Sequence, residues 1–279
     1  MSPLMTLLGF VMKRELYIAA GLLVFGASTA FGKMGWETAN RVGQKSIVDF
    51  EVISFARSYN NSHLITTEGA SVLIDAGLQE DAPALERDML KRGFDPAKLK
   101  AIIVTHGHHD HAGGAAYFKD RYNIPVVAGR GDLDLIRRGQ NDVLCPTNFF
   151  AKVRREQDQA GRYTGFEPDI LIDDRISLKE RTGIDLMISP LAGHTAGSLV
   201  ITLNNAAFVG DLFRGGMLFR KATRHFYMCD MNDNDADMNL LMEEIAPQAK
   251  VFFTGHFGPI SRRSVEKMVS KHKGRAGKS

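Results

Sequence analysis

The sequence predicts an α+β protein whose sheets are covered by helices on their outer faces. From residue 47 onward, short β-rich apolar runs separated by turn signals fill both halves of the chain. Helical patterns follow several of these runs, an order that fits layered sheets with helices outside. The 279 residues, 44% hydrophobic and 24% charged, suffice for a sizeable core. Disorder, collagen and coiled coil are therefore excluded for the bulk of the chain.

The elements are expected in alternating order. In the first half, strands are predicted over 48–55, 62–67, 70–75, 100–105 and 124–128, and helices over 82–92 and 113–122. Glu68 and Gly69 form the turn of a hairpin between the second and third strands. In the second half, strands are predicted over 184–189, 198–203, 206–209 and 251–254, and helices over 236–245 and 261–270. The polar, Arg-rich stretch 130–169 is expected to lie over the core as an insertion.

The first thirty residues have the pattern of a targeting segment. Residues 16–32 carry no charged side chain, Lys13 and Arg14 precede them, and Ser28 and Ala30 suit cleavage after Ala30. We expect residues 1–30 to be a signal peptide that directs the protein to the periplasm or outside the cell. One alternative is an uncleaved membrane anchor, since the apolar run reaches the short end of a spanning helix, about 17–25 residues. A buried core helix is the other. A globular domain over 31–260 and a basic C-terminal helix or tail over 261–279 complete the predicted organisation.

The positive charge belongs to the tail and not to the domain. The net charge of the chain is +3, but residues 261–279 contribute +6, so the other residues sum to −3. A short basic tail is usually a solvated chain end. We therefore expect no specific nucleic-acid partner, a small-molecule substrate, and membrane association only through the N-terminal segment. The oligomeric state stays open, as does pairing of Cys145 with Cys229.

A dense group of metal-ligand side chains follows the strand over 100–105. Residues 106–111 have the pattern His-x-His-x-Asp-His, with four ligand-type side chains: His106, His108, Asp110 and His111. Imidazole and carboxylate suit zinc and other borderline divalent metals. A solvated polar loop is an improbable source of four such side chains within six residues.

Three more ligand-type residues occupy comparable places. His194 follows one apolar strand in a glycine-bounded turn, Asp211 ends another, and His256 follows a third. Taken singly, each residue would more often be a turn residue. Their repetition at strand ends, as for His106, indicates that they face one edge of the sheets with the first group.

Taken together, these motifs resemble the metallo-β-lactamase superfamily of hydrolases. The resemblance rests on THGHHDHAGG, GHTAGS, VGDL and TGHFGP, in that order, and runs from about Asn60 to Pro259. It implies a four-layer αβ/βα sandwich with two divalent metals between its sheets, Zn²⁺ by preference and Fe or Mn as alternatives. The implied ligands are His106, His108 and His194 for one metal, Asp110, His111 and His256 for the other, and Asp211 as the bridge.

This ligand set predicts a metal-dependent hydrolase of the dinuclear zinc type. Two metals sharing a water lower its pKa toward neutrality and give a bridging hydroxide that attacks an ester, lactone, thioester or related bond. Asp110 is the candidate catalytic residue, because it can handle the proton after attack. The basic, aromatic segment after Asp211 is the candidate substrate pocket, with Arg220, Arg224, His225 and Tyr227 holding an anionic group. A solvated basic loop is the competing interpretation of that segment.

The resemblance also separates the members of the family. True β-lactamases of this superfamily usually carry Cys or Ser where Asp211 stands, which argues against antibiotic hydrolysis as the main activity. Glyoxalase II enzymes share the ligands but carry a glutathione-binding helical domain after the last histidine, where only 23 residues remain here. The alternative function is that of an iron-dependent sulfur dioxygenase. A metal-binding protein without catalysis is the third possibility.

Overall fold

The computed structural model describes residues 50–217 and 220–276. All of them belong to the second of two units into which the chain divides, Gly43–Ser279. The predicted signal peptide or anchor lies outside the described residues. Within them, the helices are too short or too polar for any to span a bilayer.

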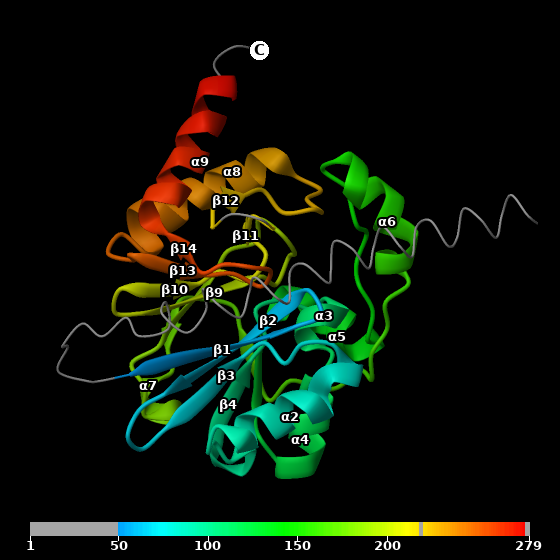
Figure 1. The fold of residues 1–279 in the computed structure, drawn as a ribbon, viewed down its shortest axis with the longest axis vertical. Coiled ribbons are helices and arrows are strands. Elements are labelled where there is room, and N and C mark those ends of the chain that lie inside the picture. The colour runs from blue at the N-terminus through cyan, green and yellow to red at the C-terminus, as the bar shows by residue number, and fades with distance from the viewer. Residues whose placement is uncertain (1–49, 218–219, 277–279) are drawn as a thin grey trace, which may run out of the picture. The chain divides into compact units, whose positions relative to one another are not determined.

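Two six-stranded sheets form the centre of this unit (Figure 1). In spatial order, the first sheet contains β1 Glu51–Arg57, β2 Asn60–Thr66, β3 Ser71–Ile74, β4 Leu99–Ile103, β5 Val126–Gly129 and β6 Ile170–Ile172. The second contains β14 Ile260–Ser261, β13 Val251–Phe253, β10 Ala206–Phe208, β9 Leu199–Leu203, β8 Met187–Pro190 and β7 Ile176–Ser177. Strands β3 to β6 pair in parallel, as do β10 and β13, and the other neighbours in these two sheets are antiparallel.

Successive side chains of each strand point to opposite faces of its sheet, and both faces are buried. In β3, Val72 and Ile74 point to a cluster between the two sheets, whereas Leu73 points to the outer face. In β9, Leu199 and Ile201 join the same inner cluster and Val200 points outward. Strands buried on both faces are apolar at nearly every position, which is why the sequence shows them as continuous hydrophobic runs.

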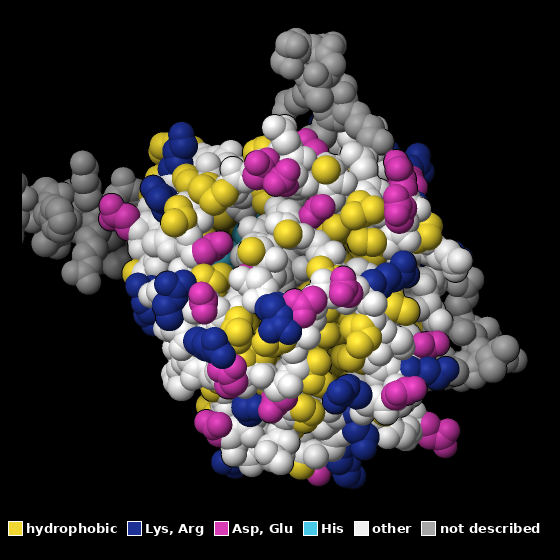
Figure 2. Space-filling model, turned by 180° about the vertical axis from the view of Figure 1, so that it is seen from behind, with side chains coloured by type: hydrophobic (Ala, Val, Ile, Leu, Met, Phe, Trp, Pro, Cys, Tyr) yellow, Lys and Arg dark blue, Asp and Glu magenta, His cyan; other side chains and the backbone are white. Residues whose placement is uncertain are grey.

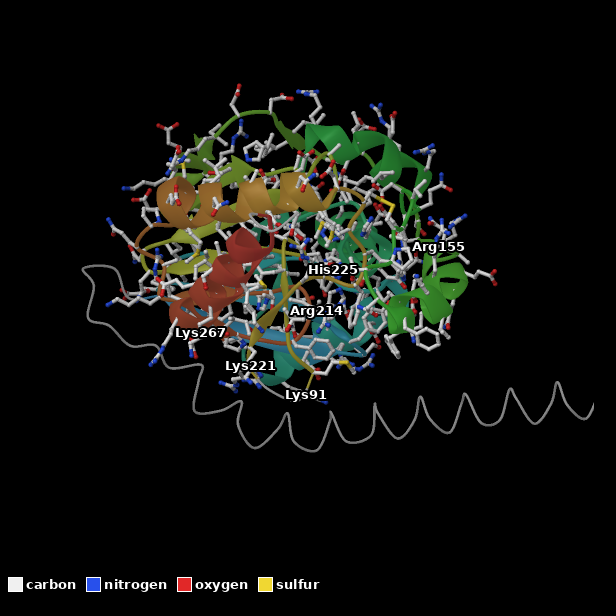
Figure 3. All side chains as sticks on the ribbon, turned by 90° about the horizontal axis from the view of Figure 1, so that it is seen from above. Lys91, Arg155, Arg214, Lys221, His225 and Lys267 are labelled. Carbon is white, nitrogen blue, oxygen red and sulfur yellow. A yellow bond between two sulfur atoms is a disulfide. The ribbon has the colours of Figure 1, made fainter. Side chains whose placement is uncertain are left out.

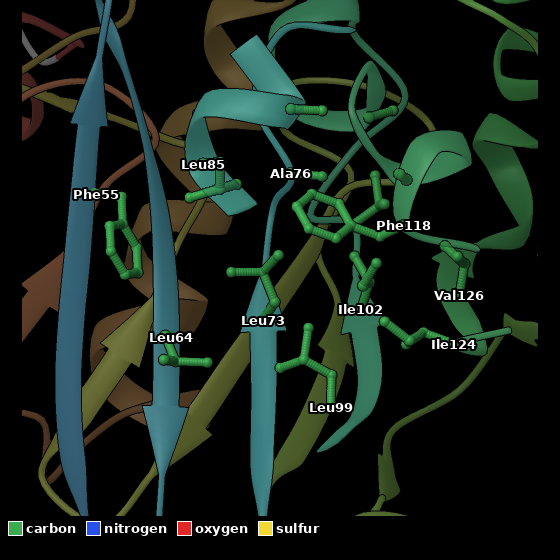
Figure 4. Close-up of a cluster of buried hydrophobic side chains, with 14 of the residues drawn as sticks. Phe55, Leu64, Leu73, Ala76, Leu85, Leu99, Ile102, Phe118, Ile124 and Val126 are labelled. Atoms are coloured by element: carbon green, nitrogen blue, oxygen red, sulfur yellow. The ribbon is translucent and has the colours of Figure 1, made fainter. Parts of the chain in front are cut away.

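Helices cover both outer faces. The first sheet is covered by α2 Ala82–Lys91 and α4 Ala115–Tyr122, through Leu85, Met89 and Phe118; Leu85 and Phe118 are labelled in Figure 4. The second is covered by α8 Met231–Leu240, the π-helical turn Leu241–Ile245 and α9 Arg262–Ala276 (Figure 1). These layers give the order helix, sheet, sheet, helix, so the predicted α+β four-layer αβ/βα sandwich is confirmed. Figure 2 shows basic and acidic side chains intermixed over one face of the molecule.

Shorter elements connect the layers. They are the helical turns Gln79–Asp81, Pro96–Lys98 and Arg130–Asp132, the helices α3 His109–Ala112, α5 Leu133–Arg138, α6 Phe149–Gln159 and α7 Lys179–Thr182, and the paired strands β11 Arg214–Gly215 and β12 Ala222–Thr223. The prediction that residues 130–169 lie outside the core is wrong for part of this stretch. Ile136 of α5 is fully buried in the outer cluster of the first sheet, and Tyr163 joins the same cluster, because α5 turns Leu135 and Ile136 away from solvent.

Candidate metal centre

The His-x-His-x-Asp-His motif lies at the carboxyl end of β4 and runs into the short helix α3. Two glycines after it let the chain turn back against the loop after β3. A Cβ at Gly113 would lie 2.2 Å from the carbonyl oxygen of His109, and one at Gly114 would lie 2.3 Å from that of Ala76. Gly255 serves the opposite side of the centre, where a Cβ would lie 2.3 Å from the His111 ring and 2.5 Å from Asp211 Oδ1. A side chain at Gly113 or Gly114 would collide with the backbone, and one at Gly255 would displace the ligand-type side chains His111 and Asp211.

Three histidines form the first group of donors. His108 Nδ1 lies 3.1 Å from His106 Nε2 and 3.2 Å from His194 Nε2. Nitrogens bound to one tetrahedral zinc ion at about 2.05 Å are about 3.3 Å apart. The three ring nitrogens are therefore already spaced as ligands of a single ion.

The second group combines two histidines with carboxylates. His256 Nε2 lies 3.4 Å from Asp110 Oδ2, and His111 Nε2 lies 3.8 Å from the same oxygen. Asp211 Oδ2 stands between the two groups. It lies 3.1 Å from His256 and 3.3 Å from His111 on one side, and 3.8 Å from both His106 and His194 on the other. A carboxylate oxygen at this place can serve both groups, so the structure brings all seven sequence-predicted ligands together.

Outer hydrogen bonds fix the orientation of the histidine rings. His111 Nδ1 lies 2.8 Å from the buried carboxylate of Asp75, and His108 Nε2 lies 2.8 Å from Asp142. His256 Nδ1 is 2.9 Å from the carbonyl oxygen of Tyr59. Each contact uses the ring nitrogen opposite the one that faces the centre, which sets the tautomer that a metal ligand needs. The sequence predicted none of these partners, although Asp75 ends an apolar strand just as Asp211 does.

Asp132 connects the two loops that carry the first three histidines. Its Oδ2 accepts hydrogen bonds from Gly107 N and Thr195 Oγ1, both at 2.7 Å, and its Oδ1 accepts one from Gly197 N at 2.8 Å. Gly107 lies between His106 and His108, and Thr195 follows His194. The 1%-exposed Asp132 thus holds the two loops in register, and its place in the polar stretch after Arg130 gave no sequence signal for this role.

The electrostatics of the centre favour cation binding. Burial lowers the pKa of His106 and of His194 well below the usual value, and neighbouring imidazoles lower it further, so both rings are neutral with free lone pairs. Burial raises the pKa of Asp110, but the charges of His111, His256 and His109 together lower it to about 2. Burial also acts against ionisation of Asp211, yet the surrounding imidazoles hold its pKa well below the usual range. Burial opposes protonation of His111 and His256, yet the charges of Asp211 and Asp110 raise the pKa of both rings. In the metal-free chain these imidazoles therefore carry the positive charge that compensates the two carboxylates, and a bound cation would replace it.

Buried atoms without a hydrogen bond point to the same conclusion. Among the described residues, His111 Nε2, His225 Nε2 and Asp211 Oδ1 are buried and accept or donate no hydrogen bond. All three face the same centre. Orphaned polar atoms are costly in a folded interior, and a cation is the group that satisfies nitrogen and carboxylate donors together. The residues therefore fit a metal centre.

The predicted substrate residues occupy different surroundings. Arg220 is exposed, and Arg224 forms an ion pair at 2.5 Å with Asp235 of α8. The Tyr227 hydroxyl donates to Asp158 of α6 at 2.5 Å. The internal partners of Arg224 and Tyr227 direct their polar groups into the protein. His225 instead lies in the metal centre, with Nε2 2.9 Å from Asp211 Oδ2.

A buried arginine that the sequence did not single out lies beside this centre. Arg214, labelled in Figure 3, is 8% exposed. Its guanidinium stacks on the Phe226 ring at 3.8 Å. Its Nη1 donates to Gly215 O, its buried Nε has no partner, and no carboxylate among the described residues lies within ion-pair distance of it. Burial lowers the pKa of Arg214 to about 10, although the charge of Asp211 acts in the opposite direction. Only burial, which no local pattern reveals, distinguishes Arg214 from the neighbouring arginines.

A disulfide bond closes the side of the centre near α6. Cys145 and Cys229 are bonded, with their Cα atoms 4.8 Å apart. The bonded segments also pair through their backbones, because Thr147 N donates to Phe226 O and Met228 N donates to Cys145 O, both at 2.8 Å. His225 and Phe226 are thereby attached to the segment that leads into α6.

An αβ/βα sandwich with a histidine–carboxylate centre where its strands end defines a class of metal-dependent hydrolases. A family model described as "Metallo-beta-lactamase superfamily" matches residues 56–256, well over half of the chain. The protein therefore belongs to the metallo-beta-lactamase superfamily.

Solved structures share the fold at low sequence identity. The metallo-beta-lactamase with a HARLDQ motif from Cronobacter sakazakii superimposes with a TM-score of 0.59 and 20% identity, covering 81% of this chain and 90% of that one. The metallo-beta-lactamase family protein TTHA1429 from Thermus thermophilus gives 0.58 and 22%, covering 81% of this chain and 80% of that one. Similarity at this level shows the fold alone.

A curated relative matches over a shorter stretch. The probable metallo-hydrolase YybB of Bacillus subtilis is 41% identical over 64 residues, 23% of this chain. That stretch spans only 27% of YybB, about a quarter of its length. The family match shows a metallo-beta-lactamase superfamily domain, and the described residues give this domain a histidine–carboxylate donor cluster.

Proposed function

We propose that the protein is a dinuclear zinc hydrolase that cleaves an ester, lactone, thioester or related bond in a small anionic substrate. One observation carries the proposal: Asp211 Oδ2 lies within 3.8 Å of ring nitrogens from both donor groups. Such an oxygen supports two ions side by side better than it supports one. Two divalent ions held by these residues would supply Lewis acidity and an activated water.

The residues of the chain have distinct parts in this reaction. His106, His108 and His194 offer neutral nitrogens to one ion, while Asp110, His111 and His256 offer donors to the other. Asp110 is 8% exposed and ionised, and its carboxylate lies beside the second group. A carboxylate in this position can accept the proton of the attacking water and pass it to the leaving group.

The anionic substrate follows from Arg214. A buried guanidinium without a carboxylate partner is unfavourable in the free protein, and a carboxylate or phosphate on the substrate would compensate its charge. Gly215, the next residue, donates its N–H to the carbonyl oxygen of His256 at 3.0 Å, which keeps Arg214 near the second donor group. We assign the anion-binding role to Arg214 in place of Arg220 and Arg224.

An iron-dependent sulfur dioxygenase remains the second candidate. Such relatives use fewer of these donors, so the convergence of two carboxylates and five histidines favours the hydrolase. Oxygen consumption with a persulfide substrate, together with one iron per chain, would establish the dioxygenase instead.

The test combines a metal count with a substrate panel. The purified protein should hold two zinc ions per chain by plasma emission spectrometry, and it should hydrolyse at least one of an ester, lactone, thioester, phosphodiester or β-lactam. The Asp110→Asn variant should lose most of its turnover and bind the second ion more weakly, while the three-histidine group keeps its zinc. Absence of hydrolysis across the panel by the two-zinc protein would refute the proposal.

We further propose that the protein acts outside the cytoplasm. The apolar run 16–32 supports export, and the disulfide between Cys145 and Cys229 is typical of oxidising compartments. Fusing residues 1–45 to alkaline phosphatase, which is active only after export, tests this. An inactive fusion that stays in the cytoplasm would contradict the proposal.

A further inference from the structure

His225 occupies a place in the metal centre that the seven-ligand arrangement does not use. Its Nε2 lies 2.9 Å from Asp211 Oδ2, closer than the nitrogen of any other histidine in the centre. The His225 ring lies 4.8 Å from the His194 ring and 5.2 Å from the His256 ring, centroid to centroid. His194, Asp211 and His225 thereby form a separate group of mutually close donor atoms.

The state of this nitrogen suits a ligand. The side chain is 3% exposed, so water does not compensate its polar atoms. Despite the short distance to Asp211, the ring nitrogen makes no well-directed hydrogen bond and is buried without a partner. The Nε2 of His111, a ligand of the seven-residue set, is buried and unpartnered in the same way beside the same carboxylate. Cations on the two sides of Asp211 would satisfy both nitrogens.

The backbone around His225 is held from several sides. The carbonyl of His225 accepts a hydrogen bond from Thr147 Oγ1 at 2.7 Å, and Nδ1 lies 3.2 Å from Tyr227 O. Four residues further on, Cys229 is bonded to Cys145. Figure 3 shows His225 and Arg214 inside the fold, whereas Lys91, Arg155, Lys221 and Lys267 lie at its periphery, where all four side chains are exposed. The imidazole is thus preorganised toward the centre by contacts outside the centre.

We infer that His225 is an eighth protein donor of the metal centre, binding a divalent cation together with His194 and Asp211. His194 belongs both to this group and to the group of His106, His108 and His194. His225 would therefore add a nitrogen ligand to the ion that those three histidines hold. The inference rests on the proposed metal centre and not on the reaction, so it can fail while the hydrolase assignment survives.

The first test counts metal-bound histidines in the wild-type chain. Long-range proton–nitrogen NMR spectra of the metal-free and Zn²⁺-loaded protein report which imidazole nitrogens bind metal. Six rings should show the shift of a coordinated nitrogen, and His63, whose two nitrogens face Ser54 and Thr254 O, should not. Five coordinated rings, with His225 unchanged, would overturn the inference whether or not the protein hydrolyses any substrate.

The second test separates a ligand from a hydrogen-bond donor. In His225→Ala, competition with a chromophoric chelator should show a Zn²⁺ Kd raised at least tenfold for one equivalent, since even residues that only support a ligand change affinity by about 10–100-fold. The visible spectrum of the Co²⁺-loaded variant should also lose the features of one nitrogen ligand. His225→Gln retains hydrogen bonding but is a poor ligand, so it should behave like alanine, while His63→Gln should leave Kd within twofold. Wild-type affinity and spectrum in His225→Gln would show that His225 only orients Asp211.

Discussion

Replacing Asp132 by asparagine tests whether one buried carboxylate holds the two histidine loops together. Asp132 accepts three hydrogen bonds, from Gly107, Thr195 and Gly197, and asparagine has only one oxygen to replace both carboxylate oxygens. If that oxygen keeps Gly107 and Thr195, the amide –NH₂ faces the N–H of Gly197 at the 2.8 Å position. One buried donor then has no acceptor.

The magnitude follows from that orphaned donor. A buried polar group left without a partner costs about 1–3 kcal/mol, so the free energy of unfolding of the metal-free chain should fall by about 2 kcal/mol. Because Gly107 lies between His106 and His108, and Gly197 lies in the loop of His194, the first donor group should lose its spacing. The Zn²⁺ affinity of that group should fall by about 10–100-fold, as for other residues that orient ligands.

Urea unfolding of the metal-free chain and chelator competition measure the two effects. Asp173→Asn is the matched control, because Asp173 pairs with Arg130 only at the exposed surface, where such pairs contribute about 0–1 kcal/mol. Unfolding free energy within about 0.5 kcal/mol of wild type and unchanged Zn²⁺ affinity in Asp132→Asn would refute the reasoning.

Four further predictions use other residues. Asp211→Ala should lower metal occupancy below two ions per chain, measured by plasma emission spectrometry, and reduce activity by two orders of magnitude or more; two tightly bound metals with full activity would contradict the bridging role. Arg214→Met should raise KM for an anionic ester at least tenfold without affecting its neutral analogue, and should not lower Tm, because an uncompensated buried charge is removed; equal effects on both esters would exclude anion binding. Burial lowers the pKa of His63 to about 4, below its unfolded value of about 6.5. The free energy of unfolding should therefore fall by about 3 kcal/mol as the pH falls from 6.5 to 4, because the unfolded chain binds the proton more readily. In His63→Gln, the unfolding free energy measured in urea should vary less over that pH range. Replacing both Cys145 and Cys229 by serine should lower the unfolding free energy by about 4 kcal/mol, given the sequence separation of 84 residues, and an unchanged urea midpoint would argue against this.

The sequence predicted those features that depend on the residues of one strand or one loop. The continuous apolar runs of β3 and β9 follow from burial on both faces, so these runs could be recognised as strands without knowing their neighbours. The His-x-His-x-Asp-His pattern gathers four donors within one loop, and the other three ligand-type residues stand at strand ends. Strand ends of a layered sheet meet along one edge, which is why these residues could be grouped in advance.

The tertiary structure decided every contact between distant segments. Asp75 and Asp132 orient ligand loops from 36 and 25 residues away, and nothing in their own neighbourhood shows that their carboxylates are buried. Arg214 and Arg224 occur in the same basic segment. The Arg214 guanidinium stacks on Phe226 with no described carboxylate within ion-pair distance, whereas Arg224 forms an ion pair with Asp235.

His225 illustrates the same division. Its sequence context indicated a basic, aromatic pocket segment, but the bond between Cys145 and Cys229 and the backbone hydrogen bonds between their segments place its ring beside Asp211. Local sequence thus determined which side chains offer metal-binding chemistry and which segments become strands, because periodicity and residue type act within one element. Folding alone determined which donors share a centre and which charges lack a partner, because both depend on segments that are far apart in the chain.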